Sequence, residues 1–448
     1  MFAIRCIIIC SLACGLLSAA ADGKTVLTIE KVRSLALEYN RQLQSAEKEI
    51  DRSRGEIISA RSGALPYISL NGRYTRNVKK AEMFLPGIFI DTTLKDEFVK
   101  IPVGQNNDFD FSVSFTQPLY AGGKVSAAMK IAKIYSDYTQ EKLKQARSEI
   151  VFASEAQFYD ALLARSNLEV LQSAYEQLTH NLEVVEKYYN QGMVSEYELL
   201  RARVEKLNLE PMIAAVQSDV NISRKHLKSF LGLPLDEEIE LTSDYSDTTL
   251  SDIPDLNTLI EFALAERPEI KQTELQRKGY SKAVTIARSN WIYPSLNFNT
   301  TYQVTAASDD FKLNENKISQ NWMVSLLLNI PIFDGGRTIG EVRKAKVDYY
   351  QAVLAERQAK DDIRLEVEEA YDAMIQAKKA LELQKETIVQ AEEGMRIANL
   401  RYESGVGTQL EVLSAQTALT DARTNLARAI YSFRLAKSAL RKATSYDL

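Results

Sequence analysis

A duplicated motif constrains this 448-residue chain more than any other feature. The segment from Gln117 to Lys124 (QPLYAGGK) recurs from Ile330 to Arg337 (IPIFDGGR). A Tyr-x-x-Gly turn recurs at the same offset, at Tyr189 and at Tyr402. The interval from the double glycine to the glycine of the turn is identical in the two copies. This constancy predicts that the chain contains two copies of one structural repeat, each with a rigid rod.

Heptad spacing indicates that the rods are paired helices. Apolar residues from Ala164 to Tyr189 follow a 4,3 spacing, and the equivalent positions from Ala377 to Tyr402 repeat it with one polar exception, Gln384. The pattern resumes after each glycine, which predicts that each long helix folds back as an antiparallel coiled coil. A helix over 124–189 would be about 100 Å long. Pro211 is a misfit, because it should kink or interrupt the first returning helix.

Four segments alternate apolar and polar residues, at 68–75, 109–116, 296–303 and 322–329. This length and period are typical of transmembrane β-strands, and the alternative is a soluble, half-buried sheet. Four strands cannot close a barrel, and lipid does not tolerate open strand edges. The chain must therefore oligomerise. A trimer, with three times four strands, leaves room for a pore and is preferred over a dimer.

Composition and the N-terminal segment exclude other classes of protein. A net charge of -5 has the wrong sign for nucleic-acid binding, and 45% hydrophobic with 26% charged residues fits neither a disordered chain nor a polytopic helical membrane protein. Residues 1–21 have the basic, apolar and small-residue order of a secretory signal peptide. Its removal would take away Cys6, Cys10 and Cys14, which are the only cysteines. A lipid anchor at Cys14 is the less favoured alternative.

No motif supports enzymatic chemistry, a cofactor or a metal. His180 and His226 stand far apart on charged helical stretches, so a shared metal site is not expected. The double glycines at 122–123 and 335–336 lack the Walker spacing and the Lys-Ser/Thr that phosphate binding needs. We interpret them as corners between strand and helix. Energy for any transport would then come from a partner protein.

These residues together resemble the TolC family of outer-membrane efflux and export channels. The resemblance rests on Asn329–Arg337 (NIPIFDGGR), Phe230–Pro234 (FLGLP), the two Tyr-x-x-Gly turns and the duplicated element order. It implies a mainly α homotrimer, in which four strands per chain form a 12-stranded transmembrane β-barrel that continues into a periplasmic α-helical coiled-coil barrel.

The resemblance also implies a function. The protein would lie in the cell outer membrane and conduct substrates passively to the exterior, within a tripartite efflux pump or a type I secretion system. Its periplasmic end would dock onto an adaptor protein, which connects it to an inner-membrane transporter. The alternative is a barrel-anchored trimeric coiled-coil protein with a structural or adhesive role.

Each repeat is expected to contain a helix, a strand hairpin, a long helix and a return helix. The long loop at 77–107 would face the exterior, and a second hairpin within it remains an open alternative. The expected signal peptide is 1–21, the equatorial linker 232–257 and the C-terminal tail 441–448. The first repeat, 22–231, would have its strands at about 67–118, its long helix at 123–190 and its return helix at 195–231. The second repeat, 258–440, would have its strands at about 294–331, its long helix at 336–403 and its return helix at 408–440.

Both turns are followed by a glutamate that two interpretations fit. Ser195 with Glu198, and Thr408 with Glu411, have the spacing of capping boxes that start the returning helices. In the resembling channels, the acidic residue before Val-Leu-x-Ala at the second turn lines the periplasmic constriction, and here that residue is Glu411. Three copies would form a carboxylate ring that favours cations. The expected gate residues are Glu411, Glu198, Ser414 and Arg201, the last as a partner for Glu198.

Two further sets of residues are expected to contact partners. The turns are small and partly apolar, which suits tip-to-tip packing with an adaptor, although each is also simply a tight turn between helices. The expected docking residues are Gly192, Met193, Val194, Ser195, Gly405, Val406, Gly407 and Thr408. Aromatic residues near the strand ends are typical of interfacial girdles. These are Tyr74, Phe109, Tyr302 and Trp322 at the loop ends, and Tyr67, Tyr120, Tyr293 and Phe333 at the helix ends.

Overall fold

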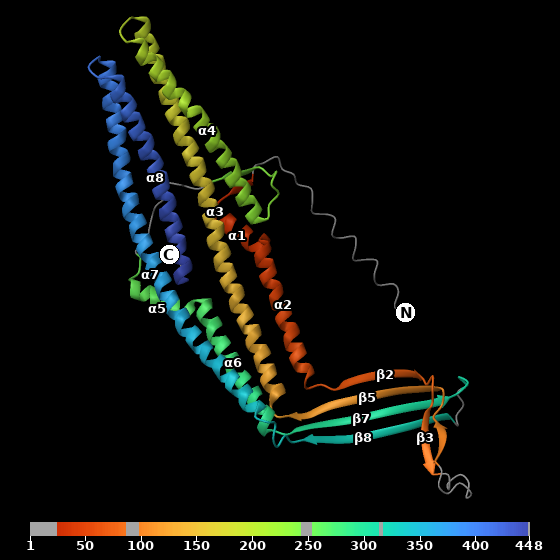
Figure 1. Ribbon diagram of the computed structural model, residues 1–448. Coiled ribbons are helices and arrows are strands. Elements are labelled where there is room, and N and C mark those ends of the chain that lie inside the picture. The colour runs from red at the N-terminus through yellow and green to blue at the C-terminus, as the bar shows by residue number, and fades with distance from the viewer. Residues whose placement is uncertain (1–24, 87–97, 243–252, 313–316, 447–448) are drawn as a thin grey trace, which may run out of the picture. The chain divides into compact units, whose positions relative to one another are not determined.

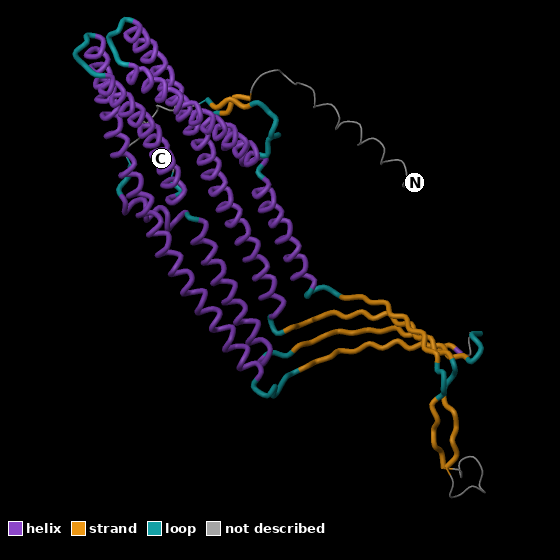
Figure 2. The backbone as a smooth tube through the Cα atoms, turned by 45° about the horizontal axis from the view of Figure 1, so that its top comes forward, coloured by secondary structure: helices purple, strands orange, loops and turns teal. Residues whose placement is uncertain are grey.

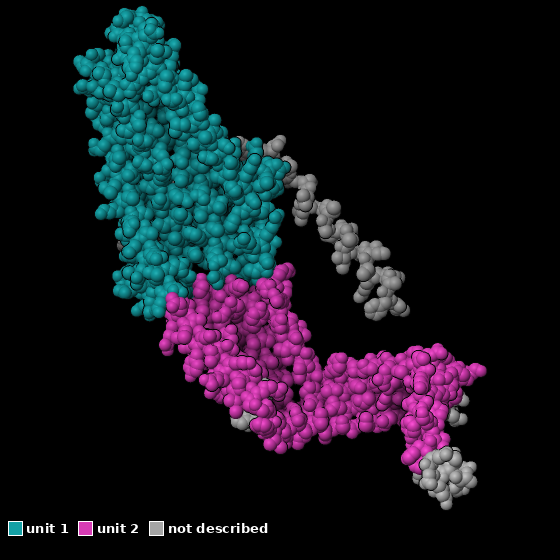
Figure 3. Space-filling model, viewed as in Figure 1, with its two compact units in different colours: residues 1–46, 143–267, 361–448 teal, residues 47–142, 268–360 magenta. Residues whose placement is uncertain are grey.

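The computed structural model describes residues 25–86, 98–242, 253–312 and 317–446. The expected signal peptide at 1–21 lies outside the described residues. Contacts divide the chain into two compact units (Figure 3), which are a helical unit of residues 1–46, 143–267 and 361–448 and a sheet-bearing unit of residues 47–142 and 268–360.

Two helical hairpins contain the four longest helices of the described chain (Figure 1). In the first, α3 (Lys124–Asn190) precedes α4 (Glu196–Leu231); in the second, α7 (Arg337–Glu403) precedes α8 (Gln409–Thr444). Both α3 and α7 have 67 residues, and both α4 and α8 have 36, as the repeat requires. None of the described helices combines the length and apolar character needed to cross a membrane.

The seam predicted on α7 is the side that its neighbours cover. Leu381, Ala398 and Tyr402 are buried, whereas most residues between the seam positions are exposed. Gln384, the polar exception, is half-buried and its side-chain oxygen has no hydrogen-bond partner among the described residues.

Pro211 lies inside α4 without interrupting it, so the expected interruption is wrong. A proline removes one backbone hydrogen bond and crowds the preceding turn. Burial of Leu199 and Ala202 before it, and of Val220 and Leu227 after it, anchors α4 on both sides of that local defect.

The helical unit also holds short elements that sequence periodicity does not reveal. Strand β1 (Thr25–Leu27) pairs in parallel with β6 (Ile239–Leu241), which lies in the expected linker. Helix α5 (Leu256–Glu266) begins two residues before the expected second repeat. Helix α1 (Ile29–Tyr39) belongs to the same unit, whereas α6 (Pro268–Ile292) and most of α2 (Arg41–Ser62) belong to the sheet-bearing unit.

The expected tail from residue 441 is wrong, because α8 continues to Thr444. The reason is an ion-pair cluster around Glu155, a fully buried carboxylate on α3. One oxygen of Glu155 accepts hydrogen bonds from Arg441 on α8 and from Arg33 on α1. A buried carboxylate is costly unless it is paired, so this pairing holds the last turn of α8 in place.

The sheet-bearing unit contains four antiparallel strands (orange in Figure 2), in the order β2-β5-β7-β8 that is labelled in Figure 1. Their register places Leu70, Val113, Tyr302 and Trp322 side by side on one face. The next positions along the strands place Asn71, Ser112, Gln303 and Asn321 together on the other face. The predicted alternation therefore forms one continuous apolar face, and a second face that is polar except for Met323 and Leu327 on β8. The strands are β2 (Tyr67–Arg76), β5 (Asn107–Ala121), β7 (Ser295–Ser308) and β8 (Ile318–Asn329).

A second hairpin does form within the loop at 77–107. Strand β3 (Ala81–Pro86) pairs antiparallel with β4 (Phe98–Val103). Residues 87–97 of the same loop lie outside the described residues.

The double glycines form corners between strand and helix, as expected. Gly122 has a φ of +62° and Gly335 a φ of +68°, a conformation that L side chains rarely adopt. Gly122 is also tightly packed, since an added Cβ would lie 2.8 Å from Cβ of Tyr293. At the second corner, Asp334 accepts hydrogen bonds from the N–H and the hydroxyl of Thr338, which hold the pKa of Asp334 below its usual value.

Candidate functional site at the helical tips

The two turns between paired helices have the same backbone structure. In the first, the N–H of Gly192 bonds the carbonyl of Tyr189 at 2.9 Å and the N–H of Met193 bonds that of Tyr188 at 2.9 Å. Gly405 and Val406 make the equivalent bonds at 3.0 Å in the second turn. Both glycines have a φ of +73°. This is the Schellman ending of a helix, which satisfies the last carbonyls and reverses the chain.

Each returning helix begins with the predicted hydroxyl cap. The hydroxyl of Ser195 accepts from the N–H of Glu198 at 3.4 Å, and that of Thr408 accepts from the N–H of Glu411 at 3.3 Å. The carboxylate of Glu411 does not bond back to the cap. It accepts instead from Nε of Arg401, at 3.1 Å across the turn. Glu411 is therefore held in an ion pair that the sequence interpretation missed.

A hydrophobic cluster joins the two hairpins near their tips. Tyr402 packs against Val185 within it, and the rings of Tyr402 and Tyr188 have centroids 5.9 Å apart. The two hairpins thus meet through apolar contacts directly behind the turns. The cluster consists of Val185, Leu199, Ala202, Ala398, Tyr402 and Val412.

The other expected gate residues occupy two separate environments. Glu198 lies near Tyr402, where burial and then the charge of Glu198 raise the pKa of the Tyr402 phenol. The structure gives no ion pair between Glu198 and Arg201 in these described hairpins. Arg201 lines a cavity of about 350 Å³ between the hairpins together with Ser414. Because Arg201 and Ser414 occupy equivalent positions of the two repeats, the duplication brings them to the same cavity.

The docking residues divide into exposed and structural members. Met193 is 66% exposed and Val406 is 70% exposed, so both offer an apolar side chain at a tip. Gly407 has a different role, since an added Cβ would lie 2.9 Å from Cβ of Arg401 and 3.0 Å from the backbone of Tyr402. Gly407 therefore permits the close packing of the turn itself.

The loop-end aromatics lie on the apolar face of the sheet as neighbouring pairs. Tyr74 is opposite Phe109, with ring centroids 5.1 Å apart, and Tyr302 is opposite Trp322. Phe311, which the sequence interpretation did not include, completes a cluster with Tyr74 at 5.8 Å. Among the aromatics at the helix ends, Tyr67 begins β2 and Tyr120 lies at the end of β5, one residue before its last. Tyr293 packs beneath Gly122, and Phe333 is largely exposed.

Comparison with known proteins decides the family. The family model described as "Outer membrane efflux protein" matches residues 32–233 and 259–445, in two blocks that correspond to the two repeats. The chain belongs to this family. It is an outer-membrane efflux channel with its helical hairpins in the periplasm.

Individual relatives are distant but cover most of the chain. Outer membrane protein TolC of Vibrio cholerae is 22% identical over 97% of this chain and 93% of its own length. Cobalt-zinc-cadmium resistance protein CzcC of Cupriavidus metallidurans is 22% identical over 89% of this chain and 85% of its own. The crystal structure of the Campylobacter jejuni CmeC outer membrane channel superposes with a TM-score of 0.77 at 20% identity, covering 93% of this chain and 85% of that chain. The structural likeness establishes the fold.

Proposed function

We propose that three copies of this chain close into one duct across the outer membrane. The observation that carries the proposal is the four-stranded sheet, which has a continuous apolar face and two unpaired edges, β2 and β8. Unpaired edges are not stable in lipid, so β8 of one copy must pair with β2 of the next. Twelve strands enclose a wider interior than the filled interior of eight.

The two faces of the sheet fit lipid on the outside and water on the inside. On the polar face, Asp110 accepts hydrogen bonds from Arg73 at 3.3 Å and from Gln303 at 3.0 Å, linking β2, β5 and β7. Charged groups paired in this way suit a hydrated lumen. The rest of this face is mainly serine, threonine and amide side chains, with Asp108 on β5 and the apolar Met323 and Leu327 on β8. No pocket for a particular cargo is evident in the composition of these described strands, so we assign the choice of cargo to the inner-membrane transporter.

Exposed apolar residues on α7 support the same oligomer. Tyr350, Leu354, Leu365 and Leu383 are each more than half exposed. At 100° per residue they fall on one side of the helix. Exposed apolar side chains aligned on one side of a helix are stabilised when a partner covers them, and we infer that a neighbouring copy does so.

At the periplasmic end, Glu411 is proposed to form the selectivity ring of the closed duct. Its pairing with Arg401 leaves the Glu411 side chain 43% exposed, so the carboxylate remains within reach of passing ions. Met193 and Val406 are proposed to contact the adaptor, whose transporter supplies the energy.

Cross-linking between subunits tests closure of the barrel directly. The only natural cysteines are at positions 6, 10 and 14. We would combine Ser69→Cys on β2 with Ser325→Cys or Ser319→Cys on β8, all on the polar face. Oxidation should produce a covalent species that stops at the trimer, whereas each single variant should remain monomeric on a denaturing gel. Covalent dimers without trimers, or an open ladder beyond the trimer, would overturn the proposed closure.

A further inference from the structure

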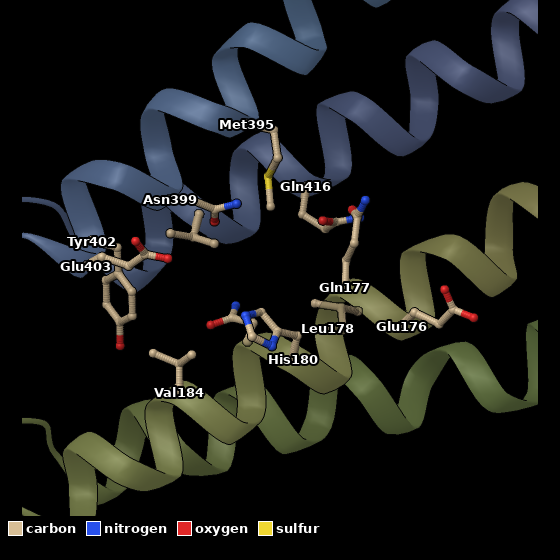
Figure 4. Close-up of a pocket in the computed structure, with 12 residues that line it drawn as sticks. Glu176, Gln177, Leu178, His180, Val184, Met395, Asn399, Tyr402, Glu403 and Gln416 are labelled. Carbon is tan, nitrogen blue, oxygen red and sulfur yellow. The ribbon is translucent and has the colours of Figure 1, made fainter.

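A cavity of about 380 Å³ lies between the two helical hairpins, behind the tips (Figure 4). Helix α3 forms one side, and α7 with α8 forms the other. Its volume is within the range of small-molecule sites. Four of its lining residues are apolar: Leu178, Val184, Met395 and Val412.

The cavity contains buried oxygens that lack hydrogen-bond partners among the described residues. Gln416 is 6% exposed and Tyr402 is 8% exposed, and the Gln416 side-chain oxygen and the Tyr402 hydroxyl are both unpaired. The side-chain oxygen of Gln177 is unpaired as well. The Gln416 amide nitrogen already donates to Thr420 at 3.3 Å, so what remains available on Gln416 is an acceptor. Leaving a buried polar group without a hydrogen-bond partner is unfavourable, so a partner that donates hydrogen bonds would be favourable here.

Charge favours a cation in the same place. Glu403 and Glu176 line the cavity, and the described lining includes no lysine or arginine. Neither carboxylate has an ion-pair partner in the described parts of the chain. A cleft with charges of one sign attracts the opposite charge. In Figure 4, Gln177 and Gln416 extend toward each other from opposite hairpins, with Met395 beside them.

We propose that this cavity binds a small organic cation, in which a primary ammonium group is joined to an apolar or aromatic body. The ammonium group donates to the unpaired oxygens of Gln177 and Gln416. Glu403 and Glu176 supply the compensating negative charge, and Leu178 and Val412 contact the apolar body. The site is separate from the Glu411 ring, because Glu411 does not line this cavity.

Binding at this place should influence opening, a consequence that rests on the proposed function. The ligand would contact both hairpins at once, so its affinity depends on their separation. A ligand shifts a conformational equilibrium toward the state that it binds better. An amine that bridges the hairpins therefore favours the arrangement in which they are together, and should lower the conductance of the channel.

Calorimetry with the purified full-length protein in detergent tests binding without relying on transport. The probe is 2-phenylethylamine, with 2-phenylethanol as the neutral control and phenylacetate as the anionic control. We expect saturable binding of the amine alone. Equal binding of the alcohol, or no saturable binding of the amine, would overturn the proposal. Displacement of the amine by an equal concentration of Mg²⁺ would also overturn it, since it would indicate a site for hydrated metal ions.

Variants locate the site. Gln416→Leu and the pair Glu403→Gln with Glu176→Gln should each weaken amine binding at least tenfold. Glu183→Gln, on the same helix α3 but outside the cavity, is the matched control and should bind normally. Gln416→Leu removes a buried oxygen that has no partner in the described chain, and with it the 3.3 Å hydrogen bond to Thr420, in exchange for an apolar group of similar size. Its thermal unfolding should therefore occur close to that of the wild type. Unweakened binding by both cavity variants would refute the assignment.

Bilayer recordings separate the site from the proposed function. The amine, added on the periplasmic side, should reduce the conductance of the wild-type channel but not that of Gln416→Leu. Unreduced conductance, with calorimetric binding intact, would refute the coupling to opening. Absence of any conductance would instead contradict the proposed duct, whatever the calorimetry gives.

Discussion

The two helical tips share one backbone but differ in how they hold their acidic residue. Glu198 and Glu411 occupy equivalent positions of the two repeats, and both follow the same Schellman turn and hydroxyl cap. At the second tip, Arg401 precedes the turn and pairs with Glu411 at 3.1 Å. The residue equivalent to Arg401 in the first tip is Tyr188, which instead packs on Tyr402. Duplication has therefore preserved the turn while assigning the two carboxylates different neighbours.

This difference indicates separate roles for the two tips. The first contributes an aromatic contact that joins the hairpins, and its carboxylate faces the Tyr402 phenol. The second contributes a carboxylate that is paired with an arginine. Because this ion pair is at the surface, its strength depends on solvent and salt. Substitutions at equivalent positions of the two repeats test whether the tips differ in this way.

The largest expected effect is on adaptor docking. Val406→Trp and Met193→Trp each place a bulky side chain at an exposed tip, and either should abolish substrate export while trimers still reach the outer membrane. Export assays in cells that contain the full pump measure this, with Val389→Trp, at an exposed position of α7 several turns before the tip, as the control. Normal export in both tip variants would refute the docking surface, and loss in only one would show that the tips are not equivalent partners.

The two corner glycines allow a second comparison between equivalent positions of the repeats, this time in the sheet-bearing unit. Gly122→Ala should destabilise the protein more than Gly335→Ala, because both residues have a positive φ but only Gly122 is tightly packed against Tyr293. The left-handed conformation alone costs roughly 1–2 kcal/mol for alanine. Thermal unfolding of the purified trimers measures the difference. Equal losses in the two variants would show that packing at Gly122 does not matter.

Ion selectivity tests the two glutamates. Glu411→Gln should reduce the preference for cations more than Glu198→Gln does, if Glu411 lines the constriction. Arg401→Gln should increase that preference, because it removes the positive charge paired with Glu411. Reversal potentials across a salt gradient measure these changes, which should shrink at about 1 M salt as screening shortens to about 3 Å. A larger change from Glu198→Gln would reverse the assignment of the two tips.

The smallest expected effects concern the caps. Ser195→Ala and Thr408→Ala should each cost about 1 kcal/mol in the first turn of α4 and of α8, respectively. Their hydrogen bonds have nearly the same length, 3.4 Å and 3.3 Å, so similar costs are expected. Hydrogen–deuterium exchange of the backbone amides in these turns measures the effect. Ser195→Thr is the control, because it keeps the hydroxyl. Unequal costs would show that the caps differ in their surroundings.

Sequence patterns were sufficient to predict the elements in which a regular residue spacing recurs. The seam that includes Leu381 and Ala398, the strand alternation and the left-handed Gly192 and Gly405 all follow from local spacing, and the structure contains them. Contacts without a period were missed. Arg401 reaches Glu411 across the turn between α7 and α8, and only the geometry of that turn determines the contact.

Tertiary packing also determined what the sequence could not. Strands β1 and β6 are three residues each, too short for alternation to identify them. The end of α8 depends on Arg441 meeting Glu155, which lies far away in the chain. The unpaired oxygens of Gln177 and Gln416 come together only when the hairpins pack.

Single-channel recording of the purified wild-type protein in a planar bilayer tests directly whether the trimer is an ion-conducting duct. A trimeric duct with a hydrated lumen and a carboxylate ring should give discrete openings that are cation-selective. An anchored structural or adhesive protein, with a plugged barrel, should give none. Correctly inserted trimers that do not conduct ions would contradict the proposed duct.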